Sequence, residues 1–399
     1  MRAVPFVYLL LFIAFYVLIS LGANQCLSEL VSFKRRKRIK LLIILTSIFF
    51  IITFIYLYIW PLNARNTSNY TWNLFFNAIL SIDFIFKIPL TLSLLTGWFF
   101  KEIRRPIIHF LGFIISLCLS SSVLYGTIFG EKELITNNVN LELNSLPPAF
   151  DGFKILQYSD THLGSFIVSD RIMKKTSEKV KELNPSVIMF TGDLVNNFGN
   201  ETDGWDSLFN AINENKKSFA ILGNHDYGNY SNWKSDSVKN RNFDEIINDH
   251  YKFNFILLRN ENYKLKLGND SIFIIGVENW GHAPFPQYAN LDKAMLDIPE
   301  QSFKILLTHD PAHWESVVKE RQDIAVTLSG HTHGMQWGIK KAGITFSPAY
   351  FVRKYWGGLY NFGNSFLYVN TGLGMVGVPW RINMPGELTL ITLKRIEVD

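Results

Sequence analysis

The sequence predicts a chain in two parts, four membrane-spanning α-helices followed by an α/β domain. Residues 1–130 contain four apolar stretches, each close to the length of about 20 residues that crosses a bilayer as a helix. From Phe153 onward, short apolar runs that end in polar residues alternate with amphipathic stretches, a pattern typical of an α/β domain. At 399 residues the chain is long enough for both parts. The predicted boundaries are a membrane region over 1–130, a linker over 131–149 and a second domain over 150–399.

The positive charge of the chain is concentrated in its N-terminal third. The sequence has 39 Lys and Arg against 34 Asp and Glu, but residues 1–130 hold 12 basic and only 3 acidic residues, which leaves 27 and 31 for the rest. The basic balance therefore belongs to the membrane region, and no nucleic-acid binding is expected of the second domain. Both cysteines, Cys26 and Cys118, also lie in the first third, so the second domain has neither a disulfide nor a thiolate metal site.

The four spans are expected over about residues 3–22, 41–60, 74–100 and 107–129. The first is interpreted as an uncleaved anchor, because its basic residues follow the apolar run and no small-x-small pattern precedes Asn24. The 23–40 connection contains six Lys and Arg and the 101–105 connection three, whereas 61–73 contains only Arg65. The positive-inside rule then places the two basic connections in the cytoplasm. We therefore expect a multi-pass protein of the cell membrane whose second domain is extracytoplasmic.

One pair of opposite charges lies inside the third predicted span. Asp83 and Lys87 are four residues apart and would share one face of the helix. The pair could be an ion or proton relay. Alternatively, the two charges neutralise each other, or Lys87 extends its amine towards the membrane surface.

Five predicted strands of the second domain are each followed by residue types that bind metals. Helices are expected between them over about 170–183, capped by Ser169 or Asp170, and over about 204–214. In layered α/β folds ligands bind beyond the carboxyl ends of the strands, so the five ends are expected to converge on one site. The runs 153–159, 187–191, 218–222, 303–308 and 324–328 lead to Asp160-Thr161-His162, Gly192-Asp193, Gly223-Asn224-His225-Asp226, His309-Asp310 and Gly330-His331-Thr332-His333.

The candidate ligands in these segments are two carboxylates, one amide oxygen and four imidazoles. This sulfur-free set suits divalent manganese, iron or zinc. Its size exceeds the needs of one ion, so two divalent metal ions with one bridging carboxylate are predicted. Two such ions about 3.5–4 Å apart can hold a phosphate and activate a shared water, which indicates hydrolysis of a phosphoester. The candidate ligands are Asp160, His162, Asp193, Asn224, His309, His331 and His333.

His225 and Asp226 are the predicted catalytic residues beside the ligands. His225 follows the candidate ligand Asn224 but is not needed by the metals. It is therefore the predicted proton donor to the leaving oxygen, while a metal-bound hydroxide attacks phosphorus. Asp226 either orients His225 or serves only the turn.

The order Asp-x-His, Gly-Asp, Gly-Asn-His-Asp, His, Gly-His-x-His resembles that of the calcineurin-like metallophosphoesterase superfamily, over residues 153–393. The C-terminal motifs Gly372-Leu373-Gly374, Pro379-Trp380-Arg381 and Glu387-Leu388-Thr389-Leu390 are similar to those of its bacterial membrane-anchored phosphodiesterase branch. The resemblance implies a four-layer αββα sandwich. It also implies one metal held by Asp160, His162, Asp193 and His333, a second held by Asp193, Asn224, His309 and His331, and His225 as proton donor.

Two positions depart from the pattern of the superfamily. Asn196 stands where many relatives have an acid after Gly-Asp-Leu-Val, and Met335 replaces a glycine after the last histidine pair. Neither is a predicted ligand, so both concern the shape of the pocket and hydrolysis is still expected. Of two further histidines, His282 is interpreted as a loop residue, with a pocket-lining role as the alternative. His313 is interpreted as a surface or capping residue.

An aromatic and basic segment covers residues 348–360. It could enter the bilayer interface, where Trp, Tyr and Lys are favoured, or pack as a loop beneath the final strands. The first alternative would favour a lipid with a phosphodiester or pyrophosphate headgroup as substrate.

The predicted function is that of a membrane-anchored, two-metal phosphoesterase that hydrolyses phosphodiesters, including lipid-linked or phospholipid-like ones, at the bilayer. One alternative is a pyrophosphohydrolase of a nucleotide-lipid, which would suit a cytoplasmic domain. Another is a transporter or sensor in which the four spans carry the function and the metal domain is accessory. Neutralising Asp83 and Lys87 would leave hydrolysis intact in an enzyme but abolish the biological activity of a transporter.

Overall fold

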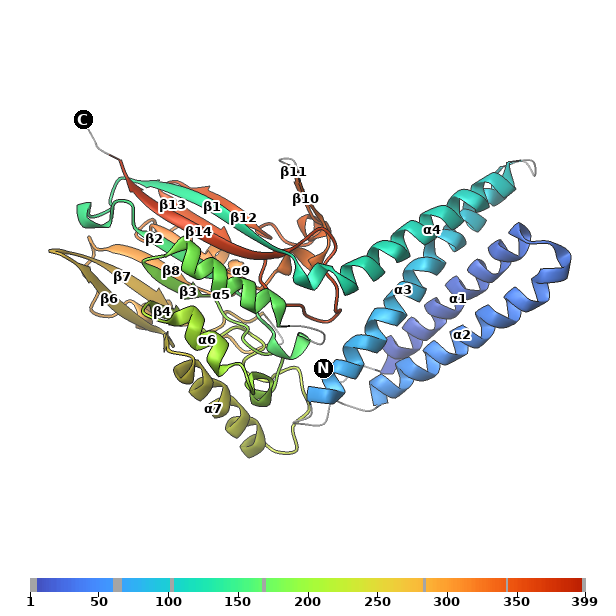
Figure 1. The fold of residues 1–399 in the computed structure, drawn as a ribbon, viewed down its shortest axis with the longest axis horizontal. Coiled ribbons are helices and arrows are strands. Elements are labelled where there is room, and N and C mark those ends of the chain that lie inside the picture. Colours follow the sequence, from blue (N-terminus) through green and yellow to red (C-terminus); the bar gives the residue numbers. More distant parts are fainter. Residues whose placement is uncertain are drawn as a thin grey trace. The chain divides into compact units, whose positions relative to one another are not determined.

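The computed structural model describes residues 6–59, 67–100, 104–166, 170–282, 285–341 and 344–396. The chain forms two compact units, a helical unit (1–63, 68–128 and 377–380) and an α/β unit (64–67, 129–376 and 381–399). Each unit is described by itself below (Figure 1). The predicted alternative cap Ser169 and the connection residues Arg65 and Lys101 lie outside the described residues.

The helical unit consists of four helices that are long and apolar enough to cross a membrane, as predicted. The helices extend beyond the predicted apolar stretches, most clearly where the first helix runs on past residue 22 and the second begins before residue 41. Half of the sixteen residues added at these two places are Gln, Glu, Lys or Arg, which favour helix although they are not apolar. The helices are α1 (Phe6–Leu30), α2 (Phe33–Ile59), α3 (Thr67–Trp98) and α4 (Arg105–Ile128).

The charge pair in α3 belongs to a closed polar network inside the helical unit. Lys87 Nζ lies 2.7 Å from Asp83 Oδ2 and donates to the hydroxyls of Tyr16 (2.8 Å) and Ser47 (3.0 Å). The Tyr16 hydroxyl donates to Asp83 Oδ2 at 2.5 Å. Lys87 is only 3% exposed, so its amine does not extend towards the membrane surface. Among the three predicted roles, this geometry favours mutual neutralisation, because each charge has its partner within the network.

The α/β unit contains two six-stranded sheets. In both sheets most neighbouring strands are parallel. The first sheet has the order β1 (Leu134–Leu143), β14 (Gly386–Arg395), β2 (Lys154–Tyr158), β3 (Val187–Phe190), β4 (Lys217–Ala220) and β5 (Phe255–Leu257). The second has the order β12 (Gly358–Phe362), β13 (Ser365–Val369), β9 (Val326–Ser329), β8 (Phe303–Leu307), β7 (Asp270–Gly276) and β6 (Glu261–Leu267). A separate hairpin joins β10 (Ile339–Lys341) to β11 (Ile344–Phe346).

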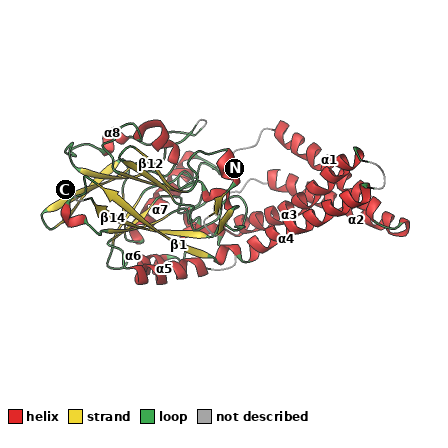
Figure 2. Cartoon of the chain, turned by 90° about the horizontal axis from the view of Figure 1, so that it is seen from above, coloured by secondary structure: helices red, strands yellow, loops and turns green. Residues whose placement is uncertain are grey.

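The two sheets face each other across a shared core, with helices on both outer faces (Figure 2). Side chains of β2 and β3, such as Ile155 and Met189, share one buried cluster with Ile305 of β8 and Val326 of β9. The outer face of the first sheet is covered by α5 (Arg171–Leu183), α6 (Asp206–Asn213) and α7 (Asp236–Lys252). The outer face of the second is covered by α8 (Leu291–Ala294) and by the π-helix (Trp314–Val318) that follows α9 (Pro311–His313). The predicted four-layer αββα sandwich is confirmed.

The elements expected to carry the site are present. The strands β2, β3, β4, β8 and β9 lie within two residues of their predicted positions, and α5 and α6 occupy the two predicted helical stretches. By contrast, the segment 131–149, predicted as a linker, is a strand over ten of its residues. β1 pairs in parallel with β14 and forms the edge of the first sheet. Its polar sequence fits this place because an edge strand is only partly buried, and Asn137 Nδ2 donates to Glu387 Oε1 at 2.8 Å.

A buried histidine in α7 should make the α/β unit sensitive to acid. The His250 ring is fully buried beside Phe190 and Phe255, Nδ1 lies 2.8 Å from the Ile246 carbonyl oxygen, and Nε2 has no partner among the described residues. Burial lowers its pKa to about 4. Because an unfolded histidine titrates near 6.5, the free energy of unfolding should fall as the pH drops from about 6.5 to about 4, by about 3 kcal/mol for this residue.

The measurement is the free energy of unfolding of the full chain in detergent between pH 7 and pH 4. The variant His250→Phe keeps a ring among the same neighbours but cannot bind a proton, so its stability should vary less with pH than that of the unmodified chain. Two parallel pH profiles would show that His250 does not carry this dependence.

Candidate metal centre

The carboxyl ends of the parallel strands bring the predicted ligands to one edge of the sandwich. β2, β3 and β4 are parallel neighbours in one sheet, and β8 and β9 are parallel neighbours in the other. Two glycines allow the loops beyond them to approach closely. A Cβ at Gly223 would overlap the Asp193 carboxylate, and a Cβ at Gly330 would overlap Asp160 and Ser159. Larger residues at these two positions would push the loops apart.

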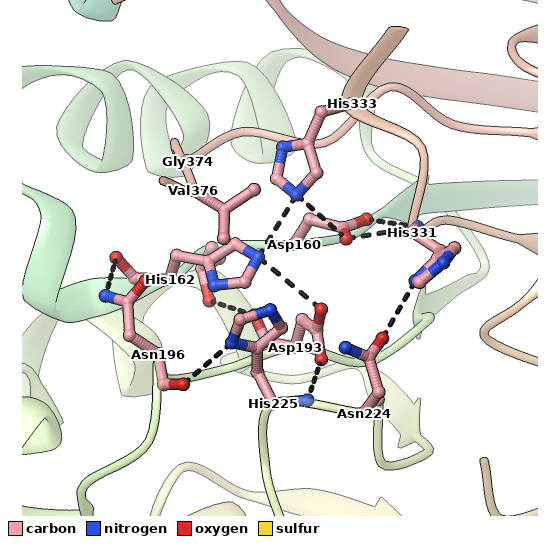
Figure 3. Close-up of polar contacts among 12 residues, drawn as sticks. Asp160, His162, Asp193, Asn196, Asn224, His225, His331, His333, Gly374 and Val376 are labelled. Atoms are coloured by element: carbon pink, nitrogen blue, oxygen red, sulfur yellow. Dashed lines mark hydrogen bonds and ion pairs between the residues drawn. The ribbon is translucent and has the colours of Figure 1, made fainter. Parts of the chain in front are cut away.

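The first donor cluster consists of Asp160, His162 and His333, all buried (Figure 3). Nε2 of His333 lies 3.1 Å from Nε2 of His162 and 3.3 Å from Oδ1 of Asp160. The cluster joins the ends of β2 and β9, which belong to different sheets. Carboxylate oxygen and imidazole nitrogen from three side chains therefore point at one small volume.

The second donor cluster consists of Asp193, His309 and His331, with Asn224 beside them. His309 Nε2 lies 3.1 Å from Asp193 Oδ2 and 3.0 Å from the amide oxygen of Asn224. The same amide oxygen lies 2.8 Å from His331 Nδ1. The structure thus brings all seven predicted ligands into two adjacent clusters.

Asp193 lies between the two clusters. Its Oδ2 is 3.5 Å from His162 Nε2 in the first cluster and 3.1 Å from His309 Nε2 in the second. Its Oδ1 accepts a hydrogen bond from the backbone N–H of His225 at 2.8 Å. This position between the clusters is the one expected of a bridging carboxylate.

The arrangement of the donor atoms suits binding of divalent cations better than it suits hydrogen bonds among the side chains themselves. His162 and His333 turn ring nitrogens towards each other, and His309 and His331 do the same at 3.3 Å. Two imidazoles that face each other can share one proton, whereas a cation accepts both lone pairs. Five of the seven predicted ligands, Asp160, His162, Asp193, His331 and His333, also have a left-handed backbone with φ between 43° and 74°. Such strain in non-glycine residues is typical of functional sites.

The electrostatics keep the two carboxylates available as ligands. Burial acts to raise the pKa of Asp160, but the neighbouring His333 imidazole holds it well below its usual value. The pKa of Asp193 is likewise lowered in spite of burial, chiefly by His309. Burial lowers the pKa of His331 to about 4, so this ring is neutral at pH 7. Anionic carboxylates and neutral imidazoles are the forms that bind metals.

Outer partners fix the orientation of two histidines. His309 Nδ1 lies 2.7 Å from the Thr191 carbonyl oxygen, so Nδ1 is the donor in this hydrogen bond and Nε2 is the nitrogen turned towards the cluster, where a bound metal would take the place of its proton. His331 Nε2 lies 3.7 Å from Asp310 Oδ2, which leaves Nδ1 turned towards Asn224. Asp310 directly follows His309 in the sequence, but its contact with His331 could not be predicted from that position.

His225 lies at the edge of the two clusters, and its Nδ1 is held by a hydrogen bond. Its Nδ1 is 2.7 Å from the Asn196 carbonyl oxygen, so Nδ1 is the donor in this hydrogen bond. Its ring is stacked on Tyr230 at 4.2 Å and stands perpendicular to the His162 ring at 4.8 Å. The Tyr230 hydroxyl accepts a hydrogen bond from Asn224 Nδ2 at 2.8 Å. Tyr230 was missed by the sequence analysis because an aromatic residue in a loop has no spacing signal.

The side chain of Asp226 holds loops together. Its two carboxylate oxygens accept backbone N–H groups of Asp193, Leu194, Val195 and Gly223 at 2.8–3.2 Å. The carbonyl of Asn196 occupies the position at His225 Nδ1 that an orienting carboxylate would take. Of the two roles considered for Asp226, the geometry favours the turn role.

Asn196 replaces the acid that many relatives have at this position, and its side chain contacts a buried carboxylate, that of Glu201. Glu201 accepts the backbone N–H groups of Gly164, Asn196, Asn197 and Phe198, and burial raises its pKa. Asn196 Nδ2 donates to the same carboxylate at 3.0 Å and to Ser165 Oγ at 3.1 Å. An acid at position 196 would place two carboxylates against each other.

The substitution Asn196→Asp should therefore destabilise the α/β unit. We expect the free energy of unfolding to fall by about 1–3 kcal/mol, because a buried donor becomes an acceptor that faces Glu201. The measurement is denaturant unfolding of the full chain in detergent. In a Glu201→Gln background the same substitution should cost less. Equal costs in the two backgrounds would contradict the proposed repulsion.

The two remaining histidines differ from the favoured interpretations. His282 Nε2 lies 3.3 Å from Asp310 Oδ2, close to His331, so the pocket-lining alternative fits it better than a plain loop role. The prediction for His313 was wrong. Its ring is buried, lies 3.0 Å from the Thr308 hydroxyl and is stacked on Trp280 at 4.8 Å.

The C-terminal motifs support the end of β2. Arg381 is buried and donates to the carbonyl oxygens of Thr371, Gly372 and Gly374 at 2.6–3.1 Å. A Cβ at Gly372 would overlap Asp160, which shows how closely this loop approaches the site. Glu387 is buried and accepts the hydroxyls of Tyr368 and Thr371, each at 2.6 Å.

The fold and the donor clusters define a metal-dependent hydrolase of the α/β class. Residues 153–335 match the family of calcineurin-like phosphoesterases, and the chain belongs to this family. Members of the family bind divalent metals and hydrolyse phosphoesters.

Several known proteins are similar to the chain over most of the α/β unit. The metallophosphoesterase YkuE of Bacillus subtilis is 30% identical over 276 residues, which are 65% of this chain and 85% of YkuE. A transmembrane protein with a metallophosphoesterase domain from Danio rerio is 27% identical over 278 residues, 68% of this chain and 60% of that protein. The UDP-2,3-diacylglucosamine pyrophosphatase LpxG of Chlamydia trachomatis is 28% identical over 231 residues, 48% of this chain and 68% of LpxG. Together with the four helices, the transmembrane relative supports a membrane localisation.

Proposed function

We propose that the protein is a membrane-anchored phosphodiesterase with two divalent metal ions, manganese, iron or zinc, in the two donor clusters. Asp160, His162 and His333 would hold one ion, and Asn224, His309 and His331 the other. Asp193 would bridge them. When bound, the two ions would polarise the phosphoryl oxygens and lower the pKa of a shared water.

The position of Asp193 is the observation that carries this proposal. One carboxylate oxygen lies within 3.5 Å of imidazole nitrogens from both clusters. A structural metal site is closed around one ion, whereas two clusters that share one carboxylate can hold a phosphate between them.

His225 is the proposed general acid. The Asn196 carbonyl oxygen at Nδ1 fixes the ring and leaves Nε2 as the nitrogen that gives its proton to the leaving oxygen. Tyr230, stacked on one face of the ring, keeps His225 from turning away.

The test is hydrolysis of bis-p-nitrophenyl phosphate by the full chain in detergent with manganese added. We expect turnover that disappears on chelation and returns with the metal, and that is slower on the monoester p-nitrophenyl phosphate. Faster turnover of the monoester would contradict the diesterase proposal. No turnover of either compound by the folded, metal-loaded protein would contradict a general hydrolase.

We also propose that the catalytic domain is extracytoplasmic, because the basic residues concentrate within residues 23–40, where α1 ends and α2 begins, and within residues 101–105. A cysteine introduced at Leu267, exposed at the end of β6, should react with an impermeant maleimide in intact cells. A cysteine at Lys37 should react only after lysis. Both tests need Cys26 and Cys118 replaced. The reverse pattern would favour a cytoplasmic pyrophosphohydrolase of a nucleotide-lipid, for which the relative LpxG, a UDP-2,3-diacylglucosamine pyrophosphatase, is the precedent.

A further inference from the structure

Exposed apolar side chains of the α/β unit gather in one short segment. Among the residues that the structure describes between 129 and 396, fourteen large hydrophobic side chains are exposed, and seven of them lie within residues 335–352. A concentration of this kind marks an interaction site, whereas scattered single residues do not. We call Trp337, Ile339, Phe346, Tyr350, Phe351 and Val352 the hairpin surface; their exposed fractions run from 43% to 76%.

The hairpin surface is continuous and firmly held. Ile339 of β10 is paired with Phe346 of β11, whose ring lies 6.2 Å from that of Phe351, and the Tyr350 ring lies 5.6 Å from the same ring. At the base of the hairpin, Ser347 Oγ donates to the Gly334 carbonyl oxygen at 2.6 Å. Figure 1 shows β10 and β11 standing apart from the two sheets. The apolar side chains therefore form one continuous surface on a hairpin that is hydrogen-bonded to the domain.

The connection that follows α4 is linked to this hairpin by contacts within the α/β unit. Only five residues separate α4 from β1, a reach of roughly 18 Å when fully extended. Gly130, in this short connection, lies so close to Arg381 that a Cβ would overlap the Arg381 carbonyl oxygen. The next residue, Ile382, pairs with Trp337 and accepts the Gly338 N–H at 3.0 Å. The hairpin thus belongs to the side of the α/β unit at which the connection from α4 enters it.

The chemistry of the surface matches a lipid headgroup layer. Trp and Tyr are enriched at membrane interfaces, and basic residues beside them favour anionic headgroups. Arg353 and Lys354, with side chains 39% and 66% exposed, directly follow the apolar residues. Aromatic residues and Arg are also enriched at protein–protein interfaces, but the five-residue connection from α4 favours a lipid occupant for this surface.

The surface also borders the donor clusters. Trp337 at its start is four residues after His333 in the chain. At its other end, Arg353 Nη1 lies 3.9 Å from Asp310 Oδ1, and Asp310 Oδ2 lies 3.7 Å from His331 Nε2. We propose that the hairpin surface inserts into the headgroup layer of the bilayer and brings the donor clusters to the phosphoester of a membrane lipid. The substrate part of this inference rests on the proposed phosphodiesterase function.

Insertion is tested on the full chain in nanodiscs of phosphatidylethanolamine and phosphatidylglycerol. A nitroxide is attached at Phe351→Cys, in a background with Cys26→Ala and Cys118→Ser, and its accessibility to oxygen and to a water-soluble nickel chelate is measured. We expect the label at Phe351 to favour oxygen, as in lipid. The matched label at Leu267→Cys, exposed on the β6–β7 hairpin, should favour the nickel chelate. Equal access of both labels to the chelate would overturn insertion, and a label at Tyr350→Cys provides an independent position.

The substrate part is tested with Phe351→Ser and the control Tyr251→Ser, another exposed aromatic residue, on α7. Phe351→Ser should reduce hydrolysis of phosphatidylglycerol in vesicles at least about tenfold and leave that of bis-p-nitrophenyl phosphate unchanged. Tyr251→Ser should change neither. Equal rates of lipid hydrolysis for the two variants, or no lipid hydrolysis by a chain that cleaves the soluble diester, would overturn the lipid substrate. Absence of soluble turnover would instead contradict the proposed function, while the label depths would still decide insertion.

Discussion

Replacing Asp193 by alanine is expected to abolish hydrolysis of bis-p-nitrophenyl phosphate and to weaken the binding of both metals. The reason is its position, since one of its oxygens lies within 3.5 Å of His162 and His309, which belong to different clusters. Loss of an outer partner of a ligand already costs about 10–100-fold in affinity or activity, so loss of the shared ligand should cost at least about 100-fold. The measurements are turnover and metal content per chain.

The matched control is Asp203→Ala, which removes an exposed carboxylate in a nearby loop. It should leave both readouts unchanged. If Asp193→Ala retained two metals per chain and normal turnover, the bridging role would be wrong. If it lost one metal only, Asp193 would be a ligand of that metal and not a bridge. Each result assigns a different role to the same carboxylate.

The strands and helices that could be predicted are those indicated by their own stretch of sequence. β2, β3, β4, β8 and β9 are short runs of apolar residues that end in a ligand type, and both features are visible in the sequence. The convergence of their ends follows from the rule that ligands bind beyond the carboxyl ends of parallel strands. The seven candidate ligands could thus be chosen before their distances were known.

β1 could not be predicted because its evidence is not local. Its sequence is rich in asparagine, and it becomes a strand by pairing with β14, whose sequence begins about 240 residues later. The contact of Asn137 with Glu387 gives one of these polar residues a partner. The β10–β11 hairpin is similar, since its short strands have exposed apolar side chains and no alternation towards a core.

Side-chain roles in the site depend on which backbone groups lie nearby. Asp226 is adjacent to His225 in the sequence, which suggested an orienting role, yet its carboxylate accepts four backbone N–H groups from two loops. The orienting acceptor is the carbonyl of Asn196, a group that every residue has and no motif reveals. Carbonyl acceptors of this kind can be found only from coordinates.

Replacing His225 by alanine is expected to slow hydrolysis to an extent that depends on the leaving group. p-Nitrophenolate is a stable anion that departs without a proton, whereas an alkoxide must be protonated as it leaves. For an alkyl diester the loss should reach about 10²–10⁴-fold, the usual contribution of a positioned general acid. For the p-nitrophenyl diester it should be much smaller, because only positioning by the ring is lost.

Comparing the alkyl and p-nitrophenyl diesters for Tyr230→Phe distinguishes the proton donor, His225, from the residue that holds its ring. This variant keeps the ring stacked on His225 but removes the hydroxyl that accepts from Asn224, so it should slow both diesters by a similar, modest factor. A His225→Ala loss that is equal for the two leaving groups would contradict proton donation. In that case His225 would act by placing the phosphate, and the proton would have to come from solvent.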